Sequence, residues 1–390
     1  MKHRRERGPA RILEDFPVGS VRRRLLLWYR DRARPLPWRS DTNAYRVWVA
    51  EAMLQQTRVA VVERAYPGFL RRFPTLRALA AASEEEVLSA WSGLGYYARA
   101  RRLREAARWV VERHGGRFPR DFARARSLPG VGPYTAAAVL SCAYGLPHAA
   151  VDSNVRRVLG RLAGEHRAGS ATVRELAAVL LDRERPGQWN QALMELGETV
   201  CLPRAPKCPS CPLRRHCRAY ASGGPSVPAR AARPGRERIF CEVYVVRDRH
   251  GFFLLERGAF RYLPHLWLPP VVLSGEPPLL SAGTPKGTFR HAIVRRDFVV
   301  EVLEARLRRS EIRAMAERRG AEWRLFRPGD LEKLGRSSFL SKALALAGVE
   351  ASFQPARRSA MQSISTLAPR ASAAQPTVIR AGGFSGKNSR

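Results

Sequence analysis

Four cysteines lie close together near the middle of the sequence. They are Cys201, Cys208, Cys211 and Cys217, with six, two and five residues between them. Because the sequence shows no sign of export, thiols at this spacing favour metal binding over disulfides. Four sulfurs hold either a tetrahedral zinc ion or an iron–sulfur cluster, and their number leaves both possibilities open.

A glycine-rich segment upstream is the second pattern with chemical meaning. Residues 128–136 have the sequence Leu-Pro-Gly-Val-Gly-Pro-Tyr-Thr-Ala, in which Gly130 and Gly132 separate two expected helices. This spacing predicts a tight hairpin whose backbone N–H groups, with the helix N-terminus that follows, can hold a phosphate. An ordinary glycine-rich connection has the same pattern, so the motif alone does not establish phosphate binding.

One acidic residue follows this hairpin at the start of another expected helix. Residues 151–158 have the sequence Val-Asp-Ser-Asn-Val-Arg-Arg-Val. A carboxylate in the place of Asp152 is most often an N-cap that accepts hydrogen bonds from backbone N–H groups. The hairpin and this carboxylate together are a much rarer combination than either one alone.

The balance of charge favours a polyanionic partner. The 390 residues include 69 Lys and Arg against 34 Asp and Glu, a formal net charge of +35. Each phosphate that is neutralised releases a counterion, so the excess favours nucleic acid, although it does not distinguish DNA from RNA. An arginine-rich genome and solubility explain the same excess without any nucleic acid.

Other features of the composition argue against membrane and secreted classes. No run approaches the ~20 apolar residues of a membrane span, and the charged N-terminal segment lacks the apolar stretch of a secretory signal. The two remaining cysteines, Cys142 and Cys241, are expected to be buried apolar residues. We expect a cytoplasmic location, associated with the nucleoid if the source is prokaryotic.

Two regions of different periodicity must position these residues. Residues 18–221 show apolar side chains at helical spacing between short Gly and Pro breaks, and Ser83 with three glutamates after it predicts a helix N-cap. Beyond the linker the period changes to that of an α+β unit. Its expected elements are strands at 239–246, 251–255 and 298–303, a turn at 248–251 and a terminal helix at 331–347.

Composition also sets the expected boundaries. Residues 222–237 are rich in Ser, Gly, Pro and Arg, as linkers are, and the C-terminal tail has a disordered composition. We expect a disordered N-terminus (1–14), a helical catalytic region (15–221) with the cysteine loop (201–217), a linker (222–237), an α+β domain (238–348) and a disordered basic tail (349–390).

At this point the residues resemble a known superfamily. The hairpin, the segment around Asp152 and the cysteine loop are similar to those of the helix-hairpin-helix DNA glycosylases. Within that superfamily, residues 34–39 (Arg-Pro-Leu-Pro-Trp-Arg), 51–59 (Glu-Ala-Met-Leu-Gln-Gln-Thr-Arg-Val) and 91–101 (Trp-Ser-Gly-Leu-Gly-Tyr-Tyr-Ala-Arg-Ala-Arg) resemble the adenine DNA glycosylases, the MutY family. The resemblance is dense over residues 20–220 and weaker over residues 238–348. It implies a mostly α glycosylase region with an iron–sulfur cluster loop, followed by an α+β, Nudix-like domain.

The resemblance also implies a reaction, the hydrolysis of the bond between adenine and its sugar. Such cleavage needs an acid for the leaving base and an anion beside the sugar cation, as in glycoside hydrolysis. Glu51 matches the acid, which should have a raised pKa, and Asp152 matches the stabiliser, which must stay ionised. Tyr134 and Asn154 match residues that position these groups. A surface helix glutamate is the alternative for Glu51, but its apolar flanks favour burial.

Tyr134 carries further information under this resemblance. Bifunctional relatives have a lysine at that hairpin position, whose amine attacks the sugar. Because the residue here is tyrosine, we expect a monofunctional glycosylase.

Other matches concern DNA contacts. Core packing is the alternative for Trp38 and Tyr96, as it is for most aromatic residues. The matches are an adenine pocket of Arg34, Trp38, Arg39 and Gln191, a wedge of Gln56 and Tyr96 with Thr57 beside them, and hairpin contacts of Gly130 and Gly132 with the DNA backbone.

The remaining implications concern the cofactor and the lesion. The four cysteines match the ligands of a [4Fe–4S] cluster, whose loop presents Arg204, Lys207, Arg214 and Arg215 toward phosphates. In the family a Phe-Ser-His loop inspects 8-oxoguanine, and this chain has Phe289, Arg290 and His291 there. Arginine only donates hydrogen bonds, so the preference for 8-oxoguanine over guanine is expected to change. The region has no clustered glutamates of a Nudix hydrolase, so no phosphohydrolase activity is expected.

The resulting expectation is a monomeric enzyme that acts on double-stranded DNA with A:8-oxoguanine or A:G mispairs. One alternative is a related mismatch glycosylase with a different lesion preference. Another is a catalytically silent DNA-binding protein that uses the cluster and the charge.

Overall fold

A computed structural model describes residues 16–39, 41–164, 170–225, 235–281, 283–334 and 337–349. The N-terminal segment 1–14, nearly all of the tail 349–390 and most of the linker lie outside the described residues, so the expectations for them are not addressed.

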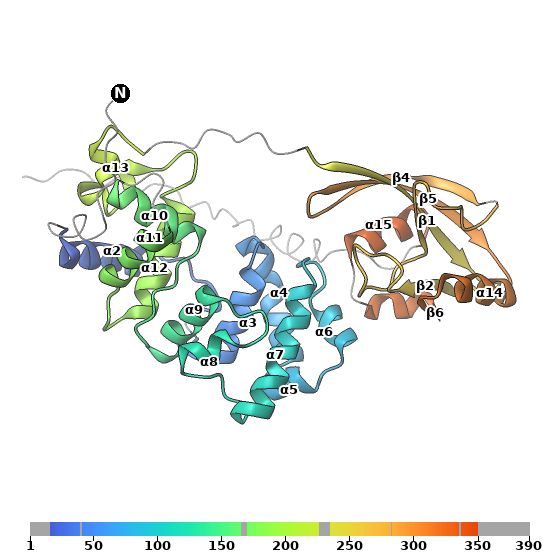
Figure 1. Cartoon of the computed structure of the whole chain (residues 1–390), viewed down its shortest axis with the longest axis horizontal. Coiled ribbons are helices and arrows are strands. Elements are labelled where there is room, and N and C mark those ends of the chain that lie inside the picture. The colour runs from blue at the N-terminus through green and yellow to red at the C-terminus, as the bar shows by residue number, and fades with distance from the viewer. Residues whose placement is uncertain are drawn as a thin grey trace, which may run out of the picture. The chain divides into compact units, whose positions relative to one another are not determined.

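The first region is helical, as its apolar spacing predicts (Figure 1). Its α-helices are α2 (Val18–Arg32), α3 (Ala44–Leu54), α4 (Val59–Arg72), α5 (Leu76–Ala81), α6 (Glu84–Ala90), α7 (Ala98–His114), α8 (Phe122–Arg126), α9 (Pro133–Tyr144), α10 (Ser153–Ala163), α11 (Ser170–Leu180), α12 (Pro186–Thr199) and α13 (Arg218–Ala221). Two short 3₁₀ turns, η1 (Cys208–Ser210) and η2 (Arg214–His216), lie among the cysteines.

Local sequence signals explain where several helices begin and end. The Ser83 side chain accepts a hydrogen bond from the Glu86 N–H, and the Glu86 carboxylate accepts one from the Ser83 N–H, so the predicted N-cap of α6 is confirmed as a capping box. Gly145 ends α9 and Gly164 ends α10. Both take left-handed backbone conformations, in which glycine has little steric strain because it lacks a Cβ.

A hydrophobic core joins α2, α10 and α12, and the cysteine loop packs against it. Leu25 of α2, Leu159 of α10 and Trp189 of α12 are each at most 1% exposed. Cys201, Cys211 and Cys217 contact the edge of this core. Because α3 packs on α9, and both α9 and α10 pack on α12, the helices that carry the candidate catalytic residues are connected through α12.

The second region contains one sheet with strand order β4-β5-β1-β2-β6, in which β3 also pairs with β1. Most neighbours are antiparallel, but β1 and β5 run parallel. The elements are β1 (Glu237–Arg247), β2 (Phe253–Arg257), β3 (Val271–Leu273), β4 (Thr284–Ile293), β5 (Arg296–Arg306), α14 (Arg309–Arg319), β6 (Glu322–Phe326), η3 (Pro328–Lys333) and α15 (Ser338–Leu346).

The two helices of this region cover opposite faces of the sheet. Ile312 of α14 packs with Tyr244 and Val246 of β1 on one face. Phe339 of α15 makes ring contacts with residues of β4, and Phe298 lies on that face as well, beside Phe260. The predicted α+β class and all three predicted strands are confirmed.

The sequence prediction was incomplete in this region. The predicted helix at residues 331–347 is wrong at its start, because Ser337 caps α15 and the residues before it form η3. Three strands, β3, β4 and β6, and helix α14 were not predicted. β3 is only three residues long, and neither β4 nor β6 contains a buried residue, so none of the three has the apolar run by which the other strands were predicted.

The expected loop at residues 289–291 is also wrong, because these residues lie within β4 and pair with β5. Side chains alternate across a strand, so Arg290 is directed to the opposite face from its neighbours. Phe289 and His291 both make edge contacts with Phe339, and burial lowers the pKa of His291 to about 4.

Over the residues that the structure describes, no helix is both long and apolar enough to cross a membrane.

Candidate active site

A cavity of about 620 Å³ brings most of the predicted catalytic and pocket residues together. Its lining comes from the segment between α2 and α3, from α3 and the loop after it, from α9, from the start of α10 and from one face of α12. The lining side chains include Trp38, Arg39, Glu51, Gln56, Thr57, Tyr134, Asp152, Asn154, Gln191, Met194 and Glu198.

Glu51 occupies the last turn of α3 and is only 7% exposed, so the alternative of a surface glutamate is wrong. Its pKa is raised from 4.5 to about 7. Burial is the main cause, hydrogen bonding to Tyr134 opposes the rise, and the nearby charges of Asp152 and Glu198 add to it. In the described structure its buried Oε2 atom has no hydrogen-bond partner. A carboxyl group in such surroundings holds its proton near neutral pH and can transfer it to a base.

Asp152 is both an N-cap and a cavity residue. Its Oδ1 accepts a hydrogen bond from the Val155 N–H at 2.7 Å, which confirms the capping prediction, and its Oδ2 accepts one from Asn154 Nδ2 at 3.1 Å. Burial raises the pKa of Asp152, and these two hydrogen bonds oppose the rise. The carboxylate is therefore fixed in direction by the helix that it caps.

A chain of hydrogen bonds connects Asn154 to the first cysteine. Arg157 Nη2 donates to Asn154 Oδ1 at 2.8 Å, and Arg157 Nε donates to the Cys201 carbonyl at 2.8 Å. The cavity wall and the cysteine loop are thus joined through one side chain.

Tyr134 is the second residue of α9, directly after the glycine hairpin. Its hydroxyl donates to Met194 Sδ at 3.1 Å, and burial raises its pKa well above the usual value. Gly130 has φ +76°, and a Cβ there would lie 2.9 Å from Arg102 Cβ, so only glycine fits the turn. Gly132 precedes Pro133 and has open space around it.

A buried carboxylate organises the predicted pocket arginines. Glu195 of α12 is 1% exposed at its side chain. It accepts two hydrogen bonds from the Arg34 guanidinium, at 2.7 and 2.6 Å, one from the Arg34 backbone N–H at 3.3 Å, and one from Arg39 Nη2 at 2.5 Å. Although burial opposes it, these bonds hold the pKa of Glu195 below its usual value. Arg34 also pairs with Glu198. Arg34 does not line the cavity itself, whereas Arg39 does.

The other two pocket residues are fixed by packing and hydrogen bonds. Gln191 Oε1 accepts a hydrogen bond from the Tyr29 hydroxyl at 2.8 Å, and Gln191 Nε2 contacts Cys142 Sγ at 3.6 Å. Trp38 is 7% exposed and packs edge-on against Tyr66, so it is both a core residue and part of the cavity wall.

The residues matched to a DNA wedge lie on two neighbouring turns. Gln56 is exposed with φ +57°, and Tyr96 is 51% exposed with φ +47°. Core packing is therefore excluded for Tyr96. Thr57 connects the turns, since its hydroxyl lies 3.4 Å from the Leu94 carbonyl. Tyr96 and the C-terminal residues Phe289, Arg290 and His291 do not line the cavity.

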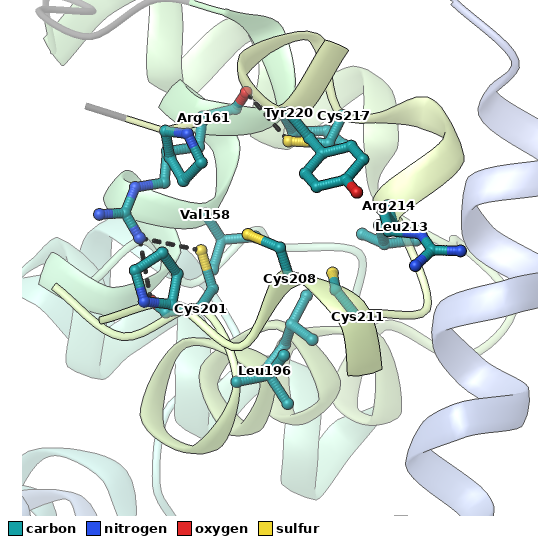
Figure 2. A pocket seen from close by; sticks show the side chains of 14 residues that line it. Val158, Arg161, Leu196, Cys201, Cys208, Cys211, Leu213, Arg214, Cys217 and Tyr220 are labelled. Carbon is teal, nitrogen blue, oxygen red and sulfur yellow. Dashed lines mark hydrogen bonds between the residues drawn. The ribbon is translucent and has the colours of Figure 1, made fainter. Parts of the chain in front are cut away.

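The four cysteines surround one small cavity of about 30 Å³ (Figure 2). Val158, Leu162, Leu196 and Leu213 supply much of the lining, and Arg161 Nη1 donates to Cys201 Sγ at 3.4 Å. Among the described residues, no group of three or more His, Cys, Asp or Glu side chains is arranged to hold a single metal ion. Four thiol groups around an apolar cavity fit the donor set of an iron–sulfur cluster, in which each thiolate binds a different iron.

Three residues of α12 were missed by the sequence analysis. Met194, Glu195 and Glu198 contact Tyr134, the pocket arginines and Arg34, respectively. Together with Gln191 they recur at three, four and seven positions, the spacing of one helix face. That spacing predicts that these residues share one face of a helix, but it does not predict which residues that face contacts.

Comparison with known proteins adds independent information. Residues 49–183 match the HhH-GPD superfamily of base excision DNA repair proteins. The chain is 49% identical over 216 residues to the adenine DNA glycosylase of Homo sapiens, covering 52% of this chain and 40% of that protein. It is 43% identical over 206 residues to the adenine DNA glycosylase of Mycolicibacterium smegmatis, covering 52% of this chain and 70% of that protein.

One solved structure, a thermostable thymine-DNA glycosylase, superposes with a TM-score of 0.50 at 30% identity, over 53% of this chain and 97% of that one. The matches span less than half of the length of the human, mouse and rat relatives.

Glu51→Gln is expected to stabilise the protein in a pH-dependent way. The pKa of the carboxyl group is higher in the folded chain than its usual 4.5, so folding stability is lost as the pH rises from about 4.5 to about 7. The variant should therefore exceed the wild type by about 1–3 kcal/mol at pH 8 and by much less at pH 4.5, measured by urea unfolding. Glu63→Gln, an exposed change on α4, is the control. A difference that does not vary with pH would contradict the burial of an ionisable Glu51.

Proposed function

This chain belongs to the adenine DNA glycosylase family of the HhH-GPD superfamily, and we propose that it is a monofunctional glycosylase that removes adenine mispaired with 8-oxoguanine or guanine in DNA. The observation that carries the proposal is the pairing of Glu51, buried with a pKa of about 7, with the fixed carboxylate of Asp152 across one cavity. The alternative of a catalytically silent DNA-binding protein gives no reason for that pair.

The chemistry follows from the two protonation states. The adenine anion is a poor leaving group, and protonation of the base makes it a better one. The neutral Glu51 carboxyl group therefore transfers its proton to N7 of the flipped base. The bond between the base and the sugar then breaks with its electron pair going to the base, and the ionised Asp152 stabilises the sugar cation. Glu51, now ionised, accepts a proton from the water that attacks the sugar.

Tyr134 supports a reaction without strand cleavage. It occupies the hairpin position of the lysine nucleophile in bifunctional relatives, and its hydroxyl is buried against Met194 with a pKa well above the usual value. A neutral phenol at this place is a hydrogen-bond partner of Glu51 and not a nucleophile that forms a Schiff base.

The cavity is large enough for a base that has left the helical stack. We propose that Trp38, Arg39 and Gln191 contact adenine and that Arg34 acts through Glu195 and Glu198, because its guanidinium is bound to both carboxylates. Gln56 and Tyr96, with Thr57 beside them, would enter the duplex next to the orphaned purine. The N–H groups of the hairpin at Gly130 and Gly132 would hold a phosphate of the backbone.

The four cysteines are proposed to hold a [4Fe–4S] cluster. The group would stabilise the loop and thereby the surface that presents Arg204, Lys207, Arg214 and Arg215 toward phosphates. Arg161, which donates to Cys201, and the apolar lining support a buried thiolate site.

We further propose that residues 238–348 form a Nudix-like domain that reads the lesion, after a catalytic region of residues 15–221. Arg290 is exposed on β4 and can donate hydrogen bonds to a guanine or 8-oxoguanine. The partner would be double-stranded DNA, bound by a monomer wherever the cell keeps its DNA.

Adenine release under single-turnover conditions tests the proposal. We expect the wild type to release adenine from duplexes with A opposite 8-oxoguanine and A opposite G, with alkali-labile sites and no spontaneous strand break. Glu51→Gln should slow release by about 10²–10⁴-fold, the usual contribution of a general acid, while DNA binding is retained.

Release from neither duplex by wild-type protein, or equal release by Glu51→Gln, would contradict the proposed function. Covalent trapping by borohydride would contradict the monofunctional chemistry alone.

Metal analysis tests the cysteine site separately. Protein purified without oxygen should contain about four iron atoms per chain and absorb visible light. Cys208→Ser should lose both, whereas Cys241→Ser, a change at a buried residue of β1, should keep both. One zinc per chain in place of iron would show that the other use of four thiolates is correct.

A further inference from the structure

Arg99, the second residue of α7, has an unusual environment for an arginine. In the described structure its side-chain hydrogen-bond partners are carbonyl oxygens and one hydroxyl, with no carboxylate among them. Burial lowers its pKa to about 10, so the half-buried group is still a cation at neutral pH. The charge is balanced by oriented peptide dipoles, some of them at the C-terminal end of α3.

The guanidinium joins two segments that are far apart in sequence. Nη1 donates hydrogen bonds to the end of α3, and Nη2 donates mainly to the turn before α7. The bonds run from Nη1 to the carbonyls of Ala52 (2.9 Å), Met53 (2.7 Å) and Gln55 (2.5 Å), and from Nη2 to Thr57 Oγ1 (2.9 Å), Leu94 O (3.1 Å) and Gly95 O (3.0 Å).

Both segments contain a strained residue whose side chain is exposed. Gln56 and Tyr96 have φ of +57° and +47°, a backbone conformation that residues other than glycine rarely adopt. Such a conformation persists only where the surrounding contacts enforce it. The partners of Arg99 lie immediately before and after Gln56 and immediately before Tyr96, so the same guanidinium holds both turns.

Aromatic stacking completes the arrangement. The Arg99 guanidinium lies 5.4 Å from the Trp91 ring centre and 5.6 Å from that of Tyr96. Trp91 Nε1 donates to the Gly95 carbonyl at 3.2 Å, so the turn is bound from two sides. The orientation of the exposed Tyr96 ring therefore depends on Arg99.

We propose that Arg99 is a positioning residue that locks Gln56 and Tyr96 into one rigid wedge and fastens that wedge to the end of the helix that carries Glu51. This inference rests on the proposed function, since a wedge is needed only if a base must leave the duplex. Unstacking a base requires work. If the two side chains lay on loops that moved independently, the stacked bases would displace them. A rigidly joined pair can instead displace a base from the stack toward the cavity.

The proposal is tested by replacing Arg99 with an unbranched residue that has no guanidinium. Arg99→Met keeps an unbranched side chain against Trp91 but removes every donor. We expect adenine release from A:8-oxoguanine to slow about tenfold or more. Release of an adenine opposite an abasic-site analogue should slow less than about threefold, because that adenine has no partner and unstacks more easily.

A conservative change and a matched control accompany it. Arg99→Lys should recover only part of the rate, because one ammonium group cannot reach carbonyls on both segments. Arg108→Met removes the same charge from an exposed position nine residues later, on the opposite face of α7, and should leave both rates unchanged. Equal slowing of both substrates by Arg99→Met, or no slowing beyond that of Arg108→Met, would contradict a wedge role.

Hydrogen exchange gives a result that does not depend on activity. In Arg99→Met the backbone amides of residues 55–58 and 94–97 should exchange faster together, while those of α9 keep their protection. Loosening of one segment without the other would overturn the coupling even if the wild type released no adenine. If the wild type is inactive but both segments loosen together, the proposed function fails and the structural lock stands.

Discussion

The site depends on one constraint, the burial of a carboxyl group with an oxygen that has no hydrogen-bond partner. Glu51 is 7% exposed, its Oε2 atom is unpaired in the described structure, and its pKa is raised to about 7 by burial. Such a group destabilises the folded chain when it ionises, so the surrounding core must hold it in place. The apolar side chains of α3 do so, because its residues on several sides are buried. The ionisation of Glu51 thus lowers the stability of the folded chain at the place where the proposed mechanism needs a proton donor.

The other charged groups that the sequence analysis assigned to this site, Arg34, Arg39 and Asp152, are each held by hydrogen-bond partners. Glu195 is as buried as any charged residue of the pocket, but Arg34 and Arg39 donate to it and keep its pKa low. Asp152 is oriented by the helix that it caps. The difference between these carboxylates and Glu51 is therefore one of partners more than of depth. In the proposed mechanism, that difference separates the acid from the ionised stabiliser within a single cavity.

Much of this site was predictable from local sequence, and the unpredicted part depends on contacts between distant segments. The apolar flanks of Glu51, the N-cap position of Asp152 and the turn glycine Gly130 are local features, and the structure bears out their local geometry. The roles of Glu195 and Arg99 depend on partners more than 40 residues away, which no periodicity records. The expected loop at Phe289 failed for a related reason, because β4 gains its strand from pairing with β5 and not from its own alternation.

The central claim, that Glu51 is the acid, is tested most directly by the rate of adenine release at saturating enzyme across pH 5 to 9. An acid with a pKa of about 7 predicts a rate that is level below that pH and falls about tenfold for each further pH unit. The mispair should be held constant and the fold checked at each pH. A rate that stays level up to pH 9 would contradict the account, because Glu51 would then be ionised throughout the upper range without any loss of catalysis.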